Sequence, residues 1–465
     1  MKVLKLSSKF TSLYLLLCVF SLLLVVSAPS TYSYGYVLFI HYLYLATALF
    51  SIFRNKKDGC LSFNFIFSVS YYFVNFVYPV FYYPTADRYF GLFSYEFDES
   101  LISKCTALAY FAYCVYLYGY ISYSGKKVRV GVLNEVRSFN MERIANVSTI
   151  LLIIVFVLFL FSGGLNAFSV LYQEADHVGG ISSYLFELVY CFSLVTTITS
   201  FYSKKLELIP LAVVIFVNFI VLMTGFRTFT ICWLIALLAL INDRINTIKL
   251  PVLLAVSIGG LVFFNTIRIV RDQDFTLNTV YEVSKTQMEG NVTESGHPVL
   301  DNAWDLIINN RSLYYLVGFA DNNGHTYGVT LLGGILGVVP MGQTVFVNIT
   351  GIPIYLLGSA TFNTVMSAGP NSRIGLGTNS VADLYLPFGI IGVIIGFFFM
   401  GRILRICYEK KDMSIYYSFA YYCLIYRALF IPRSSVLMSL RVIVWTMIIF
   451  YFINIFVGKK KTIVL

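Results

Sequence analysis

The chain of 465 residues is poor in charge and lacks the patterns that mark soluble enzymes. Only 12% of its residues are charged, whereas soluble domains carry about 25%, so an ordinary water-soluble fold is excluded. It has no CxxC pair, no His/Cys spacing typical of metal ligands and no Gly-rich phosphate loop. We therefore expect neither a metal nor a nucleotide cofactor. The eight cysteines lie in or beside apolar runs, which favours buried thiols over a disulfide framework.

Long apolar runs are what the chain has instead. Hydrophobic residues make up 58% of it, and the mean hydropathy is +0.77. A helix needs about 20 apolar residues to cross a bilayer, so the sequence predicts an all-α polytopic membrane protein embedded in a lipid bilayer. We expect about 12 transmembrane helices, at residues 10–28, 35–53, 61–83, 101–123, 147–162, 184–202, 208–224, 229–241, 251–267, 381–400, 414–430 and 436–457.

One long interval has no such run. Residues 1–267 hold the first nine predicted helices, residues 268–380 form one large extracytoplasmic loop, and residues 381–465 hold the last three helices. Apolar residues at helical spacing from Val299 to Ile308 predict an amphipathic helix in this loop. The stretches 327–341 and 345–357 are apolar but broken by Gly and Pro, so we expect them to be re-entrant or packed within the loop.

The basic residues indicate the topology. With both termini in the cytoplasm, 22 of the 33 Lys and Arg residues fall in the seven inside segments, as the positive-inside rule expects. The net charge of +10 therefore reflects topology and not nucleic-acid binding. Fifteen of these 22 are Lys, whereas nine of the eleven outer basic residues are Arg. Because the guanidinium group binds phosphate or carboxylate with two parallel hydrogen bonds, the outer arginines predict an anionic ligand.

Several outer residues are candidates for such a site. Asp383, at the start of the tenth predicted helix, and His325, in the large loop, are candidate general bases. The alternatives are a structural ion pair for Asp383, a surface hydrogen bond for His325, and snorkelling or ion pairing for each arginine. The candidate anion-binding residues are Arg227, Arg268, Arg271, Arg373, Arg427 and Arg433.

The order of several motifs resembles a known family. The motifs are Gly225-Phe226-Arg227, the pair Arg268 and Arg271, the stretch 324–332 leading to Val339-Pro340, the stretch 375–392, and the late Arg427. Together they resemble the Wzy-type O-antigen (oligosaccharide repeat unit) polymerases. The resemblance implies a membrane glycosyltransferase, GT-C-like architecture with its active site under the large periplasmic loop.

The resemblance also implies a reaction and its partners. In that family an oligosaccharide on undecaprenyl diphosphate is transferred en bloc to the next lipid-linked repeat unit, at the periplasmic face of the bacterial inner membrane. The arginines would bind the diphosphates, and a chain-length regulator protein is a candidate partner. Two alternatives stay open: a flippase or other transporter of lipid-linked oligosaccharide, and an O-antigen ligase, which shares the leaving group but uses another acceptor.

Overall fold

The computed structural model of the chain describes residues 2–55, 59–84, 91–123, 139–164, 180–223, 227–249, 251–252, 303–372 and 374–457. Every regular element in these residues is a helix, which confirms the all-α prediction. The chain divides into two compact units. Unit 1 comprises Met1–Arg129, Ala303–Glu409 and Ala428–Arg441, and unit 2 comprises Val130–Asn302, Lys410–Arg427 and Val442–Leu465.

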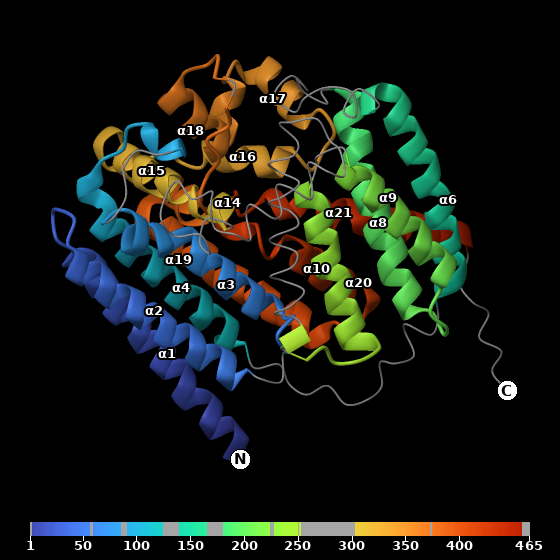
Figure 1. The fold of residues 1–465 in the computed structure, drawn as a ribbon, viewed down its shortest axis with the longest axis horizontal. Coiled ribbons are helices and arrows are strands. Elements are labelled where there is room, and N and C mark those ends of the chain that lie inside the picture. Colours follow the sequence, from blue (N-terminus) through green and yellow to red (C-terminus); the bar gives the residue numbers. More distant parts are fainter. Residues whose placement is uncertain are drawn as a thin grey trace, which may run out of the picture. The chain divides into compact units, whose positions relative to one another are not determined.

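Unit 1 combines long helices with a set of short ones (Figure 1). Its long helices are α1 (Lys2–Val26), α2 (Tyr34–Arg54), α4 (Ile102–Ser122) and α19 (Ser380–Lys410), the last ending one residue into unit 2. Its shorter helices are α3 (Phe63–Asn75), α14 (Trp304–Ile307), α15 (Asn310–Asn323), α16 (Val329–Leu336), α17 (Gly342–Thr350) and α18 (Ser359–Ala368). Single turns complete the unit: η2 (Tyr78–Tyr82), η3 (Gly91–Ser94), η4 (Glu99–Leu101), η6 (Ile354–Leu357) and η7 (Ile431–Arg433).

The α-helices in the described part of unit 2 have 13 to 22 residues. They are α6 (Met141–Phe159) with the turn η5 (Leu160–Gly164), α8 (Ile181–Tyr202), α9 (Leu208–Met223), α10 (Arg227–Arg244), α20 (Ile415–Arg427) and α21 (Met438–Val457), whose first turn lies in unit 1. Helices α6 and α8 pack along each other, and α10 packs on α20.

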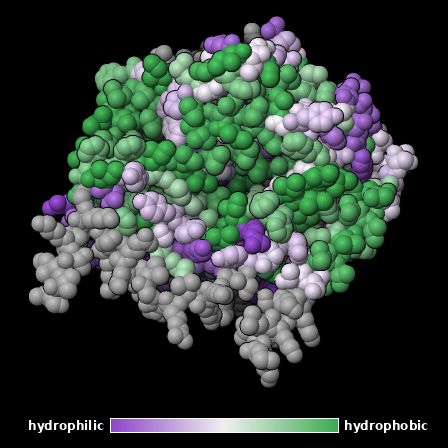
Figure 2. Space-filling model, turned by 180° about the vertical axis from the view of Figure 1, so that it is seen from behind, coloured by the Kyte–Doolittle hydropathy of each residue, from purple (hydrophilic) through white to green (hydrophobic). Residues whose placement is uncertain are grey.

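Helices occupy eleven of the twelve predicted positions, and the ninth, at 251–267, falls almost entirely outside the described residues. Seven helices among the described residues are long and apolar enough to cross a membrane, and two further apolar helices, Phe10–Val26 and Leu208–Leu222, are shorter. Apolar side chains predominate on the face that Figure 2 shows. Leu16, Ile209 and Phe456 are 65%, 79% and 85% exposed, which suits contact with lipid. The exact number of crossings stays a prediction.

Helix α4 is the centre of unit 1. Most of its side chains are buried, and its tyrosines hydrogen-bond to α2 and α3. The Tyr110 hydroxyl lies 3.1 Å from Thr47 Oγ1, and the Tyr113 hydroxyl lies 2.8 Å from Ser68 Oγ. On its other side α4 meets α19 at glycines: a Cβ on Gly119 would lie 2.1 Å from Phe398 O. Small residues of this kind let two helix backbones approach closely.

Two predicted helices are interrupted, each at a proline. The predicted helix 61–83 ends as α3 at Asn75 and continues as the π-helical turn η2, which contains Pro79. Helix α19 breaks at Gly389, which has φ 61° and ψ −144° and follows Pro387 by two residues. Proline removes a backbone donor and clashes with the preceding turn, and glycine accepts the positive φ. The break separates the first two turns of α19 from the rest.

Candidate functional site

The stretch before α19 is held by buried amides. The Asn379 side chain caps the helix, because its Oδ1 accepts the Val381 N–H at 2.9 Å. Its Nδ2 donates to Asn75 Oδ1, also at 2.9 Å. Gly377 has φ +65°, and a Cβ there would lie 2.4 Å from Asn309 Oδ1. This part of the stretch 375–392 therefore has a structural reason for its Gly and Asn, which is to fix the start of α19.

Asp383 lies in the first turn of α19 and is completely buried. Its Oδ1 accepts the Ser359 hydroxyl at 2.5 Å, and its Oδ2 accepts the Ser435 hydroxyl at 3.0 Å and the Val436 N–H at 2.9 Å. No cationic side chain among the described residues donates to it. The carboxylate therefore joins α18, α19 and the segment that follows η7. We call Asp383, Ser359, Ser435 and Val436 the Asp383 cluster.

Two arginines that the sequence predicts to be outer residues flank the segment that the Asp383 cluster holds. Arg433 ends η7, two residues before Ser435, and its guanidinium carbon lies 5.6 Å from the centre of the Phe430 ring. Arg441 follows in α21, and its Nη2 lies 2.8 Å from the position of a Cβ on Gly337. The backbone between these two arginines is thus tied to α19 through one buried carboxylate.

His325 lies at the break of α19. Its Nδ1 is 3.3 Å from Leu386 O, and the Thr326 N–H donates to the same carbonyl at 3.1 Å. The break at Gly389 frees this carbonyl, since the bond of a continuous helix would come from four residues further on. His325 Nε2 lies 3.0 Å from the position of a Cβ on Gly389. With Nδ1 protonated and donating, Nε2 carries a lone pair and can accept a proton.

A second set of contacts fastens α15 to the same half of α19. Asp321 accepts the Tyr385 hydroxyl at 2.8 Å and pairs with Lys104 of α4 at 2.6 Å. Asp321 and His325 therefore hold the first turns of α19 from one side. The Asp383 cluster holds them through α18 and the segment after η7.

In unit 2, Arg427 is 8% exposed at the end of α20. Its guanidinium carbon lies 6.0 Å from the ring centre of Phe229 in α10 and 5.9 Å from that of Tyr426. Helix α10 begins at Arg227, two residues before Phe229. The structure thus brings Arg427 to the first turn of α10, next to another predicted arginine position. The Arg227 side chain and the residues Arg268, Arg271 and Arg373 lie outside the described part of the chain.

Arg311 is an arginine of the predicted outer loop whose role the sequence did not reveal. It is 1% exposed in α15, and burial lowers the pKa of its guanidinium to about 10, so it stays charged at neutral pH. Its partners among the described residues are all neutral: Tyr95 O, Glu96 O, Asn363 Oδ1 and Ser367 Oγ, at 2.8 to 3.3 Å. Arg311 therefore binds other parts of unit 1, and because it is buried it is not accessible to an outside anion.

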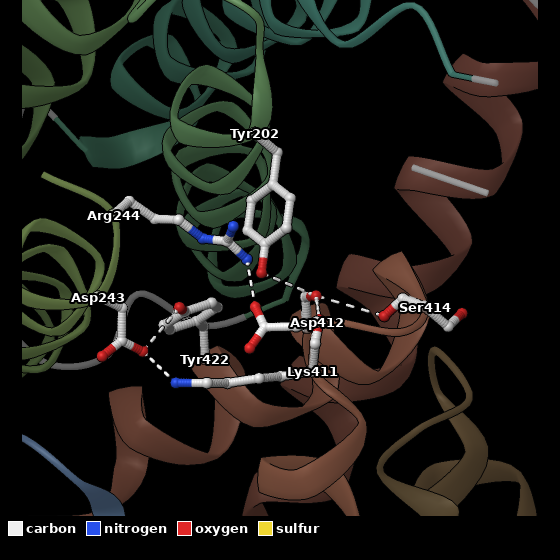
Figure 3. Close-up of polar contacts among 8 residues, drawn as sticks. Tyr202, Asp243, Arg244, Lys411, Asp412, Ser414 and Tyr422 are labelled. Atoms are coloured by element: carbon white, nitrogen blue, oxygen red, sulfur yellow. Dashed lines mark hydrogen bonds and ion pairs between the residues drawn. The ribbon is translucent and has the colours of Figure 1, made fainter. Parts of the chain in front are cut away.

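A polar network closes one end of unit 2 (Figure 3). Arg244 of α10 pairs with Asp412 at 2.8 Å, and its neighbour Asp243 pairs with Lys411. Asp243 also accepts the Tyr422 hydroxyl at 3.0 Å. These contacts join parts of the two predicted inside segments 242–250 and 401–413, and the side of the membrane on which they lie stays a prediction.

The family model described as O-antigen polysaccharide polymerase Wzy matches residues 9–462, nearly the whole chain. The chain belongs to this family. No curated protein and no solved structure matches it. Membership in the Wzy family, together with the apolar helices, makes the chain a multi-pass membrane protein of polysaccharide biosynthesis, with an O-antigen polymerase role in general and a lipid-linked oligosaccharide as substrate.

In this Wzy family member, the candidate residues predicted from the sequence that the structure describes fall into two groups, one in each unit. In unit 1, Asp383 of α19 is hydrogen-bonded to Ser435, two residues after Arg433, and His325 contacts α19 at its break. Arg427 and the position of Arg227 come together in unit 2. Ser359 and Ser435, which bind Asp383, were missed, because isolated serines carry no signal in a single sequence. The Pro387 and Gly389 pair was the one visible sign of the break in α19.

Proposed function

We propose that this chain polymerises O-antigen by transferring a lipid-linked glycan en bloc to the next lipid-linked repeat unit. An acceptor sugar hydroxyl attacks the anomeric carbon of the donor chain, the bond from that carbon to the diphosphate oxygen breaks, and undecaprenyl diphosphate leaves. The family match over residues 9–462 carries this proposal. The excess of outer arginines over outer lysines supports it, because the leaving group is a diphosphate.

The arginines are proposed to stabilise the leaving diphosphate. Charge develops on its oxygens as the bond breaks, and preorganised guanidinium groups can stabilise that charge without a metal. Arg227, Arg268, Arg271, Arg373, Arg427 and Arg433 are the proposed ligands. For Arg433 the support is its connection to the Asp383 cluster, which fixes the backbone two residues away.

We assign different roles to the two predicted bases. His325 is the proposed general base, because its Nδ1 contact with Leu386 O leaves Nε2 as an acceptor for the hydroxyl proton. Asp383 is the proposed positioning residue: its oxygens already accept three hydrogen bonds, and it is fully buried. Through Ser435 and Val436 it would set the place of Arg433. Its predicted role as a base is the alternative.

Deletion and complementation test the overall function. We expect a strain without this gene to carry single repeat units on its lipopolysaccharide, and the plasmid-borne gene to restore the ladder of chain lengths on a gel. A deletion strain with no surface glycan at all would contradict a polymerase and favour the flippase or the ligase.

The base is tested by His325→Asn, which keeps an amide donor for Leu386 O but removes the proton acceptor. We expect polymerisation to fall about 10²–10⁴-fold, the usual contribution of a general base. Thr326→Ala is the matched control, because it keeps the backbone N–H that bonds to Leu386 O. A full ladder from His325→Asn at wild-type protein level would refute this role and leave Asp383 as the candidate.

A further inference from the structure

Unit 1 contains an open pocket whose lining includes none of the candidate catalytic or anion-binding residues. It has a volume of about 580 Å³ and lies between the segment 96–99 and the second half of α15. One wall carries Glu96, Phe97, Asp98 and Glu99, and α15 supplies Tyr314, Tyr315, Gly318, Phe319, Asn322 and Asn323. This volume lies in the range of pockets that take a small ligand.

The fold holds both walls of this pocket in place. Behind the first wall, Arg311 donates to Tyr95 O at 3.3 Å and to Glu96 O at 2.8 Å, which ties the segment to α15. The far end of α15 is fixed by the pair of Asp321 with Lys104. Gly318 brings α15 close to the first wall, because a Cβ there would lie 2.9 Å from Leu101 Cδ1. The buried guanidinium of Arg311 therefore holds the segment that forms the first wall of the pocket.

The polar groups of the pocket differ in whether they already make hydrogen bonds within the protein. The Asp98 carboxylate accepts from Ser100 and caps η4, and the Glu99 carboxylate accepts the Tyr83 hydroxyl. Glu96 and Asn322 are exposed, and neither side chain makes a hydrogen bond among the described residues. One carboxylate and one amide, on opposite walls, are thus open to a ligand.

The lining selects the chemistry of that ligand. Three carboxylates and no basic side chain line the pocket, so it repels a diphosphate or an acidic sugar. The rings of Phe97, Tyr315 and Phe319 offer apolar surface, and Glu96 and Asn322 offer acceptors for hydroxyl groups. Apolar ring faces beside hydroxyl acceptors suit a sugar, which has C–H faces and hydroxyl donors.

We propose that this pocket binds an uncharged sugar residue of the glycan substrate, apart from its diphosphate. The proposal rests on the proposed function, since the substrate is taken to be a lipid-linked oligosaccharide. Glu96 and Asn322 accept sugar hydroxyl groups, and the aromatic rings cover a sugar face. The pocket contributes specificity for the glycan, and the arginines contribute affinity for the diphosphate.

The test measures glycan binding without polymerisation. The probe is the repeat-unit oligosaccharide released by mild acid from the lipid-linked repeat units of the same strain, which carries no diphosphate. It is titrated into purified full-length protein in nanodiscs. We expect saturable binding that weakens at least tenfold in Glu96→Gln combined with Asn322→Ala. The matched control is Glu142→Gln combined with Asn348→Ala, which replaces an exposed carboxylate and an exposed amide away from the pocket lining.

The outcomes test the sugar-binding proposal for the pocket independently of the proposed polymerase function. Absent binding to the wild-type protein, or equal binding by the pocket variant and the control variant, would overturn the pocket. Selective loss of binding in the pocket variant supports it even if the gene fails to restore the lipopolysaccharide ladder, and that failure would count against the polymerase role alone. Melting temperatures of both variants within a few degrees of wild type show that folding is preserved.

Discussion

Replacing Asp383 by Asn distinguishes between two possible roles of this residue, positioning of the neighbouring segment and general base catalysis. The two oxygens of Asp383 have different partners: Ser359 on Oδ1, and Ser435 with the Val436 N–H on Oδ2. An asparagine can keep its oxygen on the Oδ2 side and donate its NH₂ to Ser359 Oγ, because a serine hydroxyl also accepts. Every hydrogen bond is then retained while the negative charge is lost.

Asp383→Ala behaves differently. The Val436 N–H loses its acceptor in a buried site, which costs about 1–3 kcal/mol, and the two serine hydroxyls lose a charged partner. We expect a total loss of about 2–5 kcal/mol in the free energy of unfolding, because a hydrogen bond to a charged group contributes about 1.5–3 kcal/mol and three such bonds are lost. The variant should melt at a lower temperature and release the segment that carries Arg433.

The assay compares the lipopolysaccharide ladder with the melting temperature for both variants. A positioning role predicts that Asp383→Asn stays within about tenfold of wild-type polymerisation, whereas Asp383→Ala loses both stability and polymer. A base predicts that Asp383→Asn loses about 10²–10⁴-fold. A well-folded Asp383→Asn protein without polymer would refute the positioning argument. Ser359→Ala, which removes one donor only, should lie close to Asp383→Asn in activity.

Three further predictions concern the fold. Gly401→Ala should lower the folded yield sharply, because its Cβ would lie 2.2 Å from a backbone oxygen of α4, whereas Gly35→Ala, with no atom within 4 Å, should not. Arg311→Met should cost about 2–4 kcal/mol of stability, measured as a lower melting temperature, because buried acceptors lose their donor; wild-type stability would contradict this. Asp243→Asn and Lys411→Met, compared in a double-mutant cycle, should show a coupling of about 1 kcal/mol that falls with salt, and simple additivity would refute the pair.

The sequence was informative wherever lipid determines the residue pattern. Apolar runs predicted the helix positions well, because a crossing helix must be apolar over its length. It was less informative about interruptions: the predicted helix 381–400 extends to Lys410 and breaks at Gly389. Several backbone conformations are compatible with Pro387. A neighbouring segment selects one of them, because the Thr326 N–H donates to Leu386 O.

For the candidate site residues, the sequence predicted the residue type and its position along the chain, but not the groups that surround it in the fold. Arg311 and Arg433 are alike in sequence, as arginines of predicted outer segments, yet Arg311 is 1% exposed and bonded on several sides. Only the fold shows which guanidinium groups are already occupied. Asp383 was identified from its place at a helix start, while its three donors come from residues 24 to 53 positions away, which a single sequence does not pair.

The close meeting of α4 with α19 has a consequence for how the protein is made. Helix α4 is buried along most of its length, and its groove at Gly119 is filled by a helix that begins at Ser380. The ribosome therefore releases α4 into the membrane long before its partner exists. Until α19 arrives, this helix has to be shielded by lipid, by the earlier helices or by an insertion factor. Chains that stop before residue 380 should accordingly be recognised as incomplete and degraded.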